Sequence, residues 1–312
     1  MARYVDQGDV PGIVTLVARR GEVAVDAVGS ASVGGRPVRR NTIFRISSMT
    51  KPVTAVAAML LVEEGILHLD DAVDELLPEL AARQVLRRMD GPLDDVVPAS
   101  RPITVRDLLT FTMGFGLVMA PPGSWPVQRA ADDLALGQGP PSPGTMPAPD
   151  EWIRRLGTLP LLHQPGEAWM YNTGCDVLGV LVARASGTSF DAFVRARVFE
   201  PLGMRDTGFF VPDEKLDRFT PQYWTDSETG ERAVYDPAER GQWNRPPAFP
   251  AGGGGLVSTV DDYLAFASML AAHGRYPGGR MLSRGSVELM TSDQVTPAQK
   301  ARAAFVDRKS VV

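Results

Sequence analysis

The 312-residue sequence has very little cysteine and histidine, and each shortage excludes a class of chemistry. A single cysteine, Cys175, excludes an internal disulfide and a cysteine-based metal cage, and its apolar surroundings (CDVLGVLVARASG) predict a buried, unreactive thiol. The three histidines, His68, His163 and His273, lie far apart and have no metal-binding spacing, so we expect neither a metal nor a cofactor. The sequence also lacks a G-x-S-x-G elbow, which disfavours an α/β-hydrolase.

Long apolar runs and blocks of like charge are missing as well. No stretch reaches the ~18 apolar residues of a membrane span, and the N-terminal MARYVDQGDVPG has no apolar core of the signal-peptide kind. We therefore expect a cytoplasmic protein with no membrane contact. The net charge of −5 is spread along the chain, so nothing favours a nucleic-acid partner. A hydrophobic content of 44% and a charged content of 22% are those of an ordinary globular protein.

Local patterns predict a mixture of strands and helices. Residues 12–29 form two β-branched runs around Gly21 and predict a hairpin, and residues 42–46 predict a short strand. Residues 53–62 (VTAVAAMLLV) are too apolar for a surface helix, so they predict a helix buried on nearly all sides. Further helices are expected at residues 105–112, 175–186, 190–199 and 262–272, the last capped by Ser258-Thr259.

A proline-rich segment divides the chain. Residues 121–150 contain eight of the 26 prolines, a composition that is usually typical of a linker. Because the chemical motifs lie on both sides of it, we interpret it as a long ordered loop beside one shared site. The five tryptophans, which fall between Trp125 and Trp243, are expected either to anchor the core or to line an apolar acyl pocket.

The strongest chemical signal is Ser48-Met49-Thr50-Lys51, an S-x-x-K motif at the start of the apolar helix. A spacing of three places both side chains on one helix face, and a serine hydroxyl needs such an adjacent base to act as a nucleophile. Only four of the 32 basic residues are lysines, and arginine cannot give up its proton in a protein. A lysine at this position therefore indicates catalysis.

A second group, PGEAWMYNTG at residues 165–174, precedes the next apolar helix. The phenolate of Tyr171, stabilised by a lysine ammonium, could take the proton of Ser48 and deliver it to a leaving group. The run of glycines at residues 252–255 is not followed by Lys-Ser or Lys-Thr, so GGGGLVST predicts a tight approach to a helix cap rather than a phosphate cradle.

These motifs resemble the serine β-lactamase and penicillin-binding superfamily, in particular its class C-like branch with the family VIII carboxylesterases. The matching segments are FRISSMTKPVTAVAAMLLVEEG, ITVRDLLTFTMGFG, PGEAWMYNTGCDVLGVLVARASG, FEPLGMRDTGF and GGGGLVSTVDDYLAFASML. The resemblance implies an α+β fold, with one β-lactamase-like domain of two lobes: a sheet lobe at about 1–47 and 255–312 and a helical lobe at about 48–254. It implies that Ser48 is the acylated nucleophile, that Lys51 and Tyr171 handle the proton, and that the Ser48 backbone N–H is one oxyanion donor.

Two departures from that pattern concern the substrate-binding candidates. Class C β-lactamases carry Tyr-x-Asn, whereas here Thr173 holds the third place and the asparagine is Asn172. Gly254 offers no side chain where cephalosporinases tend to have an aromatic. Both departures favour an esterase that acts on a small-molecule ester. The alternatives are a β-lactamase or D-alanyl-D-alanine peptidase, and a catalytically weak or silent homologue.

A third departure concerns the C-terminal region. The family's last motif should follow Met290 on a sheet strand, but TSDQVTPAQKARAAFVDRKSVV contains neither the motif nor a credible strand pair. We therefore expect a C-terminally truncated member with weakened oxyanion stabilisation. Its N-terminal hairpin, left without neighbouring strands, would be poorly ordered or covered by a second copy in a homodimer.

Overall fold

The computed structural model describes residues 1–137, 139–226 and 229–303, and it combines helices with small antiparallel sheets, the α+β class that was expected. The helices are α1 (Ala2–Asp6), α2 (Thr50–Glu63), α3 (Val105–Leu109), α4 (Pro126–Asp133), α5 (Pro149–Thr158), α6 (Thr173–Ser186), α7 (Phe190–Val194), α8 (Glu200–Leu202), α9 (Val260–Ala271), α10 (Arg284–Met290) and α11 (Pro297–Ala301). Short 3-10 helices lie at Ser47–Met49, Val73–Glu75, Pro78–Leu80, Asp213–Arg218 and Gln242–Asn244, and a π-helical turn lies at Arg195–Phe199.

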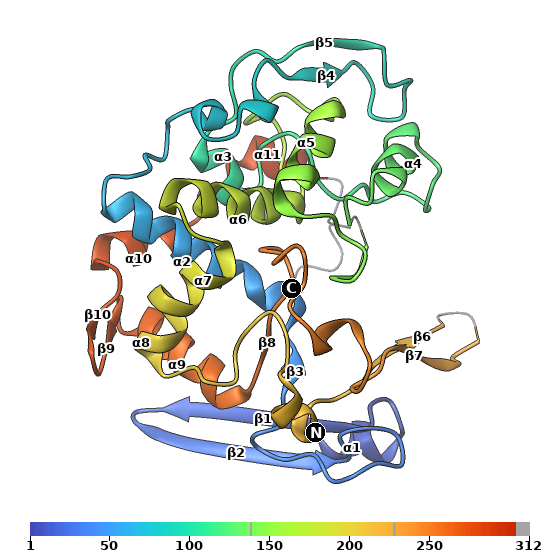
Figure 1. Ribbon diagram of the computed structural model, residues 1–312, viewed down its shortest axis with the longest axis vertical. Helices are drawn as coiled ribbons and strands as arrows, with labels where there is room; N and C mark the ends of the chain where they lie inside the picture. The colour runs from blue at the N-terminus through green and yellow to red at the C-terminus, as the bar shows by residue number, and fades with distance from the viewer. Residues whose placement is uncertain (138, 227–228, 304–312) are drawn as a thin grey trace.

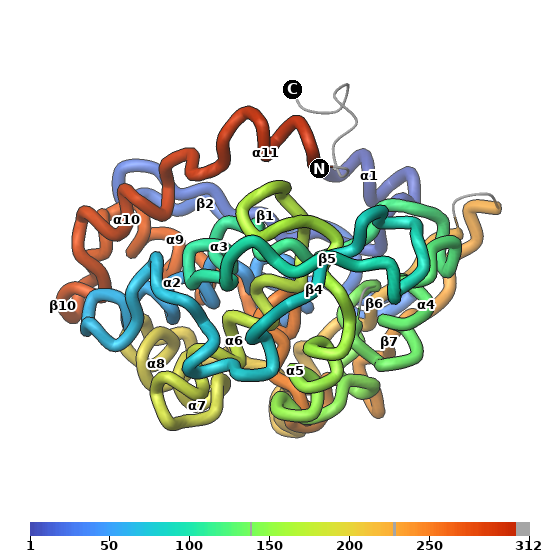
Figure 2. Tube along the Cα trace, turned by 90° about the horizontal axis from the view of Figure 1, so that it is seen from above, coloured from blue at the N-terminus to red at the C-terminus, as the bar shows by residue number. Residues whose placement is uncertain are grey.

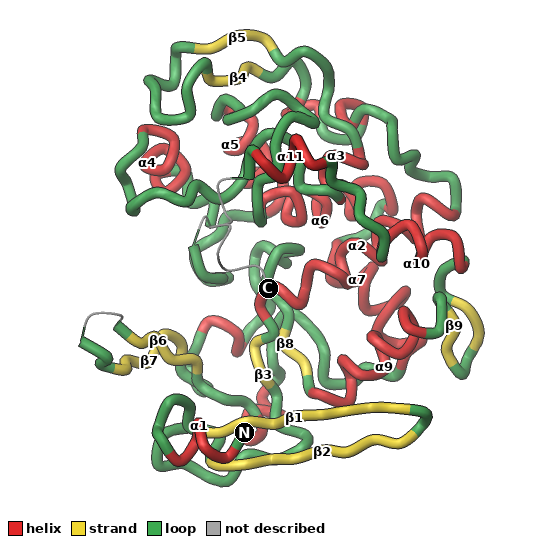
Figure 3. The backbone as a smooth tube through the Cα atoms, turned by 180° about the vertical axis from the view of Figure 1, so that it is seen from behind, coloured by secondary structure: helices red, strands yellow, loops and turns green. Residues whose placement is uncertain are grey.

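The strands of the described part pair two by two. The pairs are β1 (Gly12–Arg19) with β2 (Glu22–Gly29), β3 (Phe44–Arg45) with β8 (Val257–Ser258), β4 (Gln84–Leu86) with β5 (Val96–Pro98), β6 (Gln222–Thr225) with β7 (Arg232–Asp236), and β9 (Arg275–Tyr276) with β10 (Gly279–Arg280). In Figure 1 the region of α3 to α6 lies at the top, the long hairpin β1–β2 lies along the bottom, and α2, α7, α8 and α9 lie between them. Seen from behind in Figure 3, β1 and β2 are the longest strands, while helices fill the middle of the molecule.

The predicted N-terminal hairpin is confirmed. Its register pairs Gly12 with Gly29, and Arg20 and Gly21 at the turn both have positive φ angles (52° and 86°), as a two-residue type I′ turn requires. Within the described residues neither strand pairs with a third one, and Val17 and Val23 are 67% and 44% exposed. The expectation of a hairpin without neighbouring strands therefore holds for this part of the chain. In the view from above α11 lies on the same side as β1 and β2 (Figure 2), but Figure 1 shows the hairpin along the bottom of the molecule and α11 near its top.

The core is built around α2 and α6, which pack against each other. Apart from Pro52, the residues of α2 from Thr50 to Val62 are buried or partly buried, and α6 is buried without a break from Thr173 to Val182. Full burial of each large apolar side chain contributes about 1.5–3 kcal/mol, so this pair holds the start of α2 firmly in place. The buried apolar helix predicted at residues 53–62 is confirmed.

Other helix starts follow from their caps. Thr104 and Asp107 form a capping box at α3, in which each side chain accepts a hydrogen bond from the other residue's backbone N–H. At α9, Thr259 Oγ1 accepts from the N–H of Asp262 at 3.3 Å, so the predicted cap signal is confirmed.

Three predicted elements differ in length. The strand expected at residues 42–46 is reduced to β3, because only Phe44 and Arg45 pair with β8. The helix expected at residues 105–112 ends at Leu109, since Phe111 takes a left-handed conformation with φ 59°. The helix expected at residues 190–199 begins as α7 and changes into the π-helical turn, which leads into α8.

The proline-rich segment folds back on the rest of the molecule. It contains α4 and the start of α5, and both helices carry a proline in the first turn, where the missing N–H costs least. Gln242 Oε1 accepts hydrogen bonds from Ser142 Oγ at 2.8 Å and from the Gly144 N–H at 3.0 Å. The proline-rich segment is therefore held against the rest of the fold by contacts with Gln242, 100 residues further along the sequence.

Two of the five tryptophans take the expected core role, whereas the exposed Trp224 takes neither expected role. Trp152 and Trp243 are fully buried core residues, whereas Trp224 is 57% exposed. Trp169 packs beside Tyr171 with ring centroids 5.8 Å apart.

No single helix in the described part is long and apolar enough to cross a membrane. The bent pair Thr173–Ser186 and Phe190–Leu202 together has the length and composition of a membrane span, but the first helix of the pair is buried in the core.

Candidate active site

The start of α2 presents Ser48 at the surface with its partners behind it. Ser48 is exposed in the short turn before the helix, whereas Lys51 is buried, at 8% exposure. Lys51 Nζ donates a hydrogen bond to Ser48 Oγ at 3.1 Å. Ser47 has a φ of 42°, an unfavourable left-handed conformation for a residue with a side chain. Such strain persists only where the surroundings impose it, and it lies directly beside the candidate nucleophile.

Tyr171 reaches the same hydroxyl from the segment before α6. Its phenolic O–H donates to Ser48 Oγ at 2.6 Å, across 123 residues of sequence, and Lys51 Nζ lies 4.4 Å from the centre of its ring. The ring packs against both Phe111 and Trp169, with centroid distances of 6.0 and 5.8 Å, and these two rings also contact each other at 5.8 Å. The structure therefore brings together the three residues that the sequence singled out. Within the described residues, the side chains that hydrogen-bond to Ser48 are those of Lys51 and Tyr171.

The glycine run forms the third side of the site. Lys51 Nζ donates a hydrogen bond to the carbonyl oxygen of Gly253 at 2.5 Å. The predicted tight approach is real, but it is made to the flanks of α2 and α6 rather than to a helix cap. A Cβ on Gly252 would overlap the carbonyl oxygen of Cys175, and the Gly252 carbonyl itself accepts from Thr54 Oγ1 at 2.8 Å.

The three substrate-binding candidates lie at different depths. Asn172 precedes α6 with a φ of 83°, so a second left-handed residue adjoins the site. Thr173 is buried, at 1% exposure, and faces the interior. Gly254 lies beside the nucleophile, because a Cβ there would be 2.8 Å from Pro141 Cγ and 3.8 Å from the Ser47 carbonyl carbon. The proline-rich segment thus approaches Gly254 closely at the edge of the site.

Two ionisable groups behind the site have strongly shifted pKa values. Burial raises the pKa of the Cys175 thiol to about 12, which agrees with the prediction of a buried, unreactive cysteine. Burial also raises the pKa of Asp176 to about 6, although its hydrogen bond from Gly253 and the charge of Lys51 act in the opposite direction. Sequence reasoning missed Asp176. The available signal was an acidic residue within an otherwise apolar helix.

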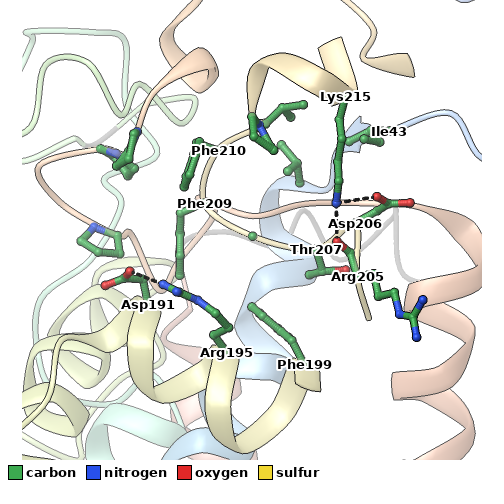
Figure 4. Close-up of a pocket in the computed structure, with 17 residues that line it drawn as sticks. Ile43, Asp191, Arg195, Phe199, Arg205, Asp206, Thr207, Phe209, Phe210 and Lys215 are labelled. Carbon is green, nitrogen blue, oxygen red and sulfur yellow. Dashed lines mark hydrogen bonds and ion pairs between the residues drawn. The ribbon is translucent and has the colours of Figure 1, made fainter. Parts of the chain in front are cut away.

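Two cavities are lined by different residues. One of about 410 Å³ is lined by Lys51, Pro52, Ala55 and Met59 of α2 and by Phe111, so it begins next to the site. The other, of about 580 Å³, shares no residue with the site. In Figure 4 its Arg195 points toward Asp191 and its Lys215 toward Asp206; the two pairs are 3.1 and 2.9 Å apart. Carboxylates therefore compensate two of the cations that line the second cavity, and Arg205 is a further cation in its lining.

Comparison with known proteins identifies the fold and then the family. EstCE1, described as a hydrolase with promiscuous acyltransferase activity, superimposes with a TM-score of 0.75 at 29% identity, covering 92% of this chain and 73% of EstCE1. The fold is therefore β-lactamase-like. The Beta-lactamase family model matches residues 1–308, and the chain belongs to this family.

Two curated relatives extend the comparison. Protein Rv1367c of Mycobacterium tuberculosis (strain ATCC 25618 / H37Rv) is 42% identical over 298 residues, which cover 95% of this chain and 71% of that protein. Esterase EstB of Burkholderia gladioli is 34% identical over 280 residues, which cover 84% of this chain and 66% of EstB. The chain therefore spans about two thirds of the length of EstB.

Proposed function

We propose that the protein is a serine hydrolase that cleaves carboxylic esters through an acyl-enzyme on Ser48. The observation that carries the proposal is the Ser48 hydroxyl, which is exposed and lies within hydrogen-bonding distance of both Tyr171 (2.6 Å) and Lys51 (3.1 Å). An exposed hydroxyl with two proton-handling partners is the arrangement that nucleophilic catalysis requires. The resemblance to an esterase and to a hydrolase with acyltransferase activity supports the same chemistry.

In the proposed reaction, Tyr171 acts as a phenolate that accepts the Ser48 proton while Oγ attacks the ester carbonyl. The Lys51 ammonium, 4.4 Å from the ring centre, stabilises the phenolate charge. Collapse of the tetrahedral intermediate breaks the ester bond, and Tyr171 returns the proton to the departing alcohol. Water then attacks the acyl-enzyme, with the same pair taking the proton of the water and returning it to Ser48.

We favour ester cleavage over β-lactam cleavage because position 254, at the edge of the site, presents no aromatic side chain. Gly254 carries no side chain, and Pro141 already occupies the space that a Cβ would need. An aromatic side chain therefore cannot be presented from this position without moving the proline-rich segment. Nitrocefin hydrolysis remains the comparison that separates the two substrate classes.

The test combines labelling with turnover. A fluorophosphonate probe should label the wild-type protein at Ser48 and leave Ser48→Ala unlabelled, and p-nitrophenyl acetate should be hydrolysed by the wild type alone. Absence of labelling, or full esterase activity in Ser48→Ala, would contradict the proposal. Rapid nitrocefin turnover with negligible esterase activity would favour a β-lactamase instead.

A further inference from the structure

A buried carboxylate lies directly behind the lysine of the site. Asp176 is on the first turn of α6 and is only 5% exposed. Burying a carboxylate costs free energy unless the charge is compensated, so a group of this kind needs partners. The start of a helix supplies partial positive charge, and the Lys51 ammonium supplies a full one. The location therefore ties the carboxylate to the chemistry of Lys51.

One glycine connects the two charged side chains. The N–H of Gly253 donates to Asp176 Oδ1 at 2.8 Å, and the carbonyl oxygen of the same residue accepts from Lys51 Nζ at 2.5 Å. Asp176 therefore fixes the position of Gly253, and Gly253 in turn fixes the position of the Lys51 ammonium. Lys51 Nζ then reaches Ser48 Oγ at 3.1 Å, so the chain of contacts runs from the buried carboxylate to the nucleophile.

The backbone at this point leaves room for the carboxylate and for little else. A Cβ on Gly253 would be 3.0 Å from both carboxylate oxygens of Asp176 and 3.1 Å from Asn172 Oδ1. Thr54 of α2 fixes the neighbouring residue through its hydrogen bond to the Gly252 carbonyl. The glycine run is therefore clamped between α2 and α6, with Asp176 as its charged anchor.

We propose that Asp176 is a positioning residue of the hydrolase, which aligns Lys51 through Gly253 and balances the positive charge of Lys51 where water is excluded. This inference rests on the proposed function. Asp176 does not touch the substrate; it acts through Lys51 and, through Lys51, on Tyr171. Among the described residues, the titratable groups that face it are Lys51 of α2 and Cys175 of its own helix, and the glycine segment faces it with backbone alone.

The negative charge of Asp176 should shift the pH dependence of the reaction in a direction that can be measured. A negative charge opposes the loss of a proton from neighbouring groups, so its removal makes the catalytic cluster easier to deprotonate. In Asp176→Asn the acid limb of the pH–rate profile should therefore move to lower pH by about one unit. A phenolate that forms at lower pH is also a weaker base and accepts the Ser48 proton less readily. The value of kcat on the plateau of the pH–rate profile should therefore fall about tenfold. KM should stay unchanged, because the carboxylate is behind Lys51.

The experiment measures fluorophosphonate labelling rates and p-nitrophenyl acetate kinetics against pH. Asp176→Asn keeps an oxygen acceptor for the Gly253 N–H, whereas Asp176→Ala removes it, so the alanine variant should lose more activity. Thr54→Val loosens the glycine run without changing any charge, and it should lower kcat without moving the pH profile. The matched control is Asp262→Asn: that half-buried carboxylate also accepts a backbone N–H (Asp206, 2.7 Å) and also has a raised pKa, but it is on α9. The control should match the wild type in both readouts.

The outcomes separate this inference from the function on which it rests. If the wild type is neither labelled nor active, the proposed function fails and this inference fails with it. If the wild type is active and Asp176→Asn matches it in kcat and in pH profile, the positioning role is wrong and the hydrolase stands. If Asp262→Asn moves the profile as far as Asp176→Asn does, the effect is unspecific and the positioning role is again wrong.

Discussion

The raised pKa of Asp176 predicts that the residue weakens the fold at neutral pH. A carboxyl group whose folded-state pKa exceeds its unfolded value contributes its full stability below the unfolded pKa and loses it as the pH rises through the folded pKa. The ordinary pKa of an aspartate is 3.8 and the pKa of Asp176 in the folded protein is about 6, so the loss occurs between these two pH values. The difference of about two units corresponds to about 3 kcal/mol.

Asp176→Asn cannot ionise and keeps an acceptor for the Gly253 N–H, so it escapes this loss. Its free energy of unfolding should exceed that of the wild type by up to about 3 kcal/mol near pH 8, and the difference should vanish near pH 4. Urea denaturation at a series of pH values measures both quantities, and the slope of each transition checks that the unfolded reference is unchanged.

The control variant, Asp107→Asn, should change the free energy of unfolding in the opposite direction. Asp107 is held by Arg101 and Thr104, and although burial opposes the shift, its pKa lies below the usual value. Asp107→Asn should therefore be less stable than the wild type at neutral pH, with a gap that narrows on acidification through the folded pKa of Asp107. The reasoning would be refuted if Asp176→Asn were less stable than the wild type near pH 8, because the buried carboxylate would then stabilise the fold.

Four further substitutions test other parts of the structure. Lys51→Arg should lower kcat by about 100-fold or more while circular dichroism stays unchanged, because the larger, planar guanidinium keeps the charge but cannot take the place of the ammonium between Ser48 Oγ and the Gly253 carbonyl; a rate near that of the wild type would contradict the role of Lys51. Tyr171→Phe should reduce fluorophosphonate labelling of Ser48 by about 100-fold, since the hydrogen bond at 2.6 Å disappears while the ring contacts remain. Gly254→Ala should cost about 1–3 kcal/mol in urea denaturation, because the new Cβ would be 2.8 Å from Pro141 Cγ; an unchanged midpoint would mean that the proline-rich segment yields freely. Thr259→Ala should cost about 1 kcal/mol through loss of the α9 cap and leave kcat unchanged.

Local features of the fold were predictable because their causes are local. The S-x-x-K spacing places two side chains on one helix face, and the apolar run at residues 53–62 can only be a buried helix, so α2 and its first residues followed from sequence. Tyr171 is 123 residues from Ser48, and the proton-accepting chemistry of a phenol, together with the resemblance to a family, suggested that the two meet. No local pattern encodes a contact over that distance.

Most of the features that could not be predicted from the sequence depend on backbone groups and backbone conformations. The partner of Lys51 is the carbonyl of Gly253, and every residue has a carbonyl, so residue types carried no signal. The early end of α3 depends on a left-handed Phe111, a conformation that phenylalanine rarely adopts and that tertiary packing imposes. The depth of Asp176 depends on the packing of α2 against α6, which is again a long-range property.

The burial of Lys51 has a practical consequence for attaching the protein to a surface. Amine-directed reagents react with exposed ammonium groups, and the chain offers few: Lys300 has a side chain that is 52% exposed, whereas Lys51 is 8% exposed as a residue. Such reagents reach Lys300 and the N-terminal amine of Met1 well before they reach Lys51. The protein can therefore be coupled to a solid support through its amines with the lysine of the candidate active site still unmodified.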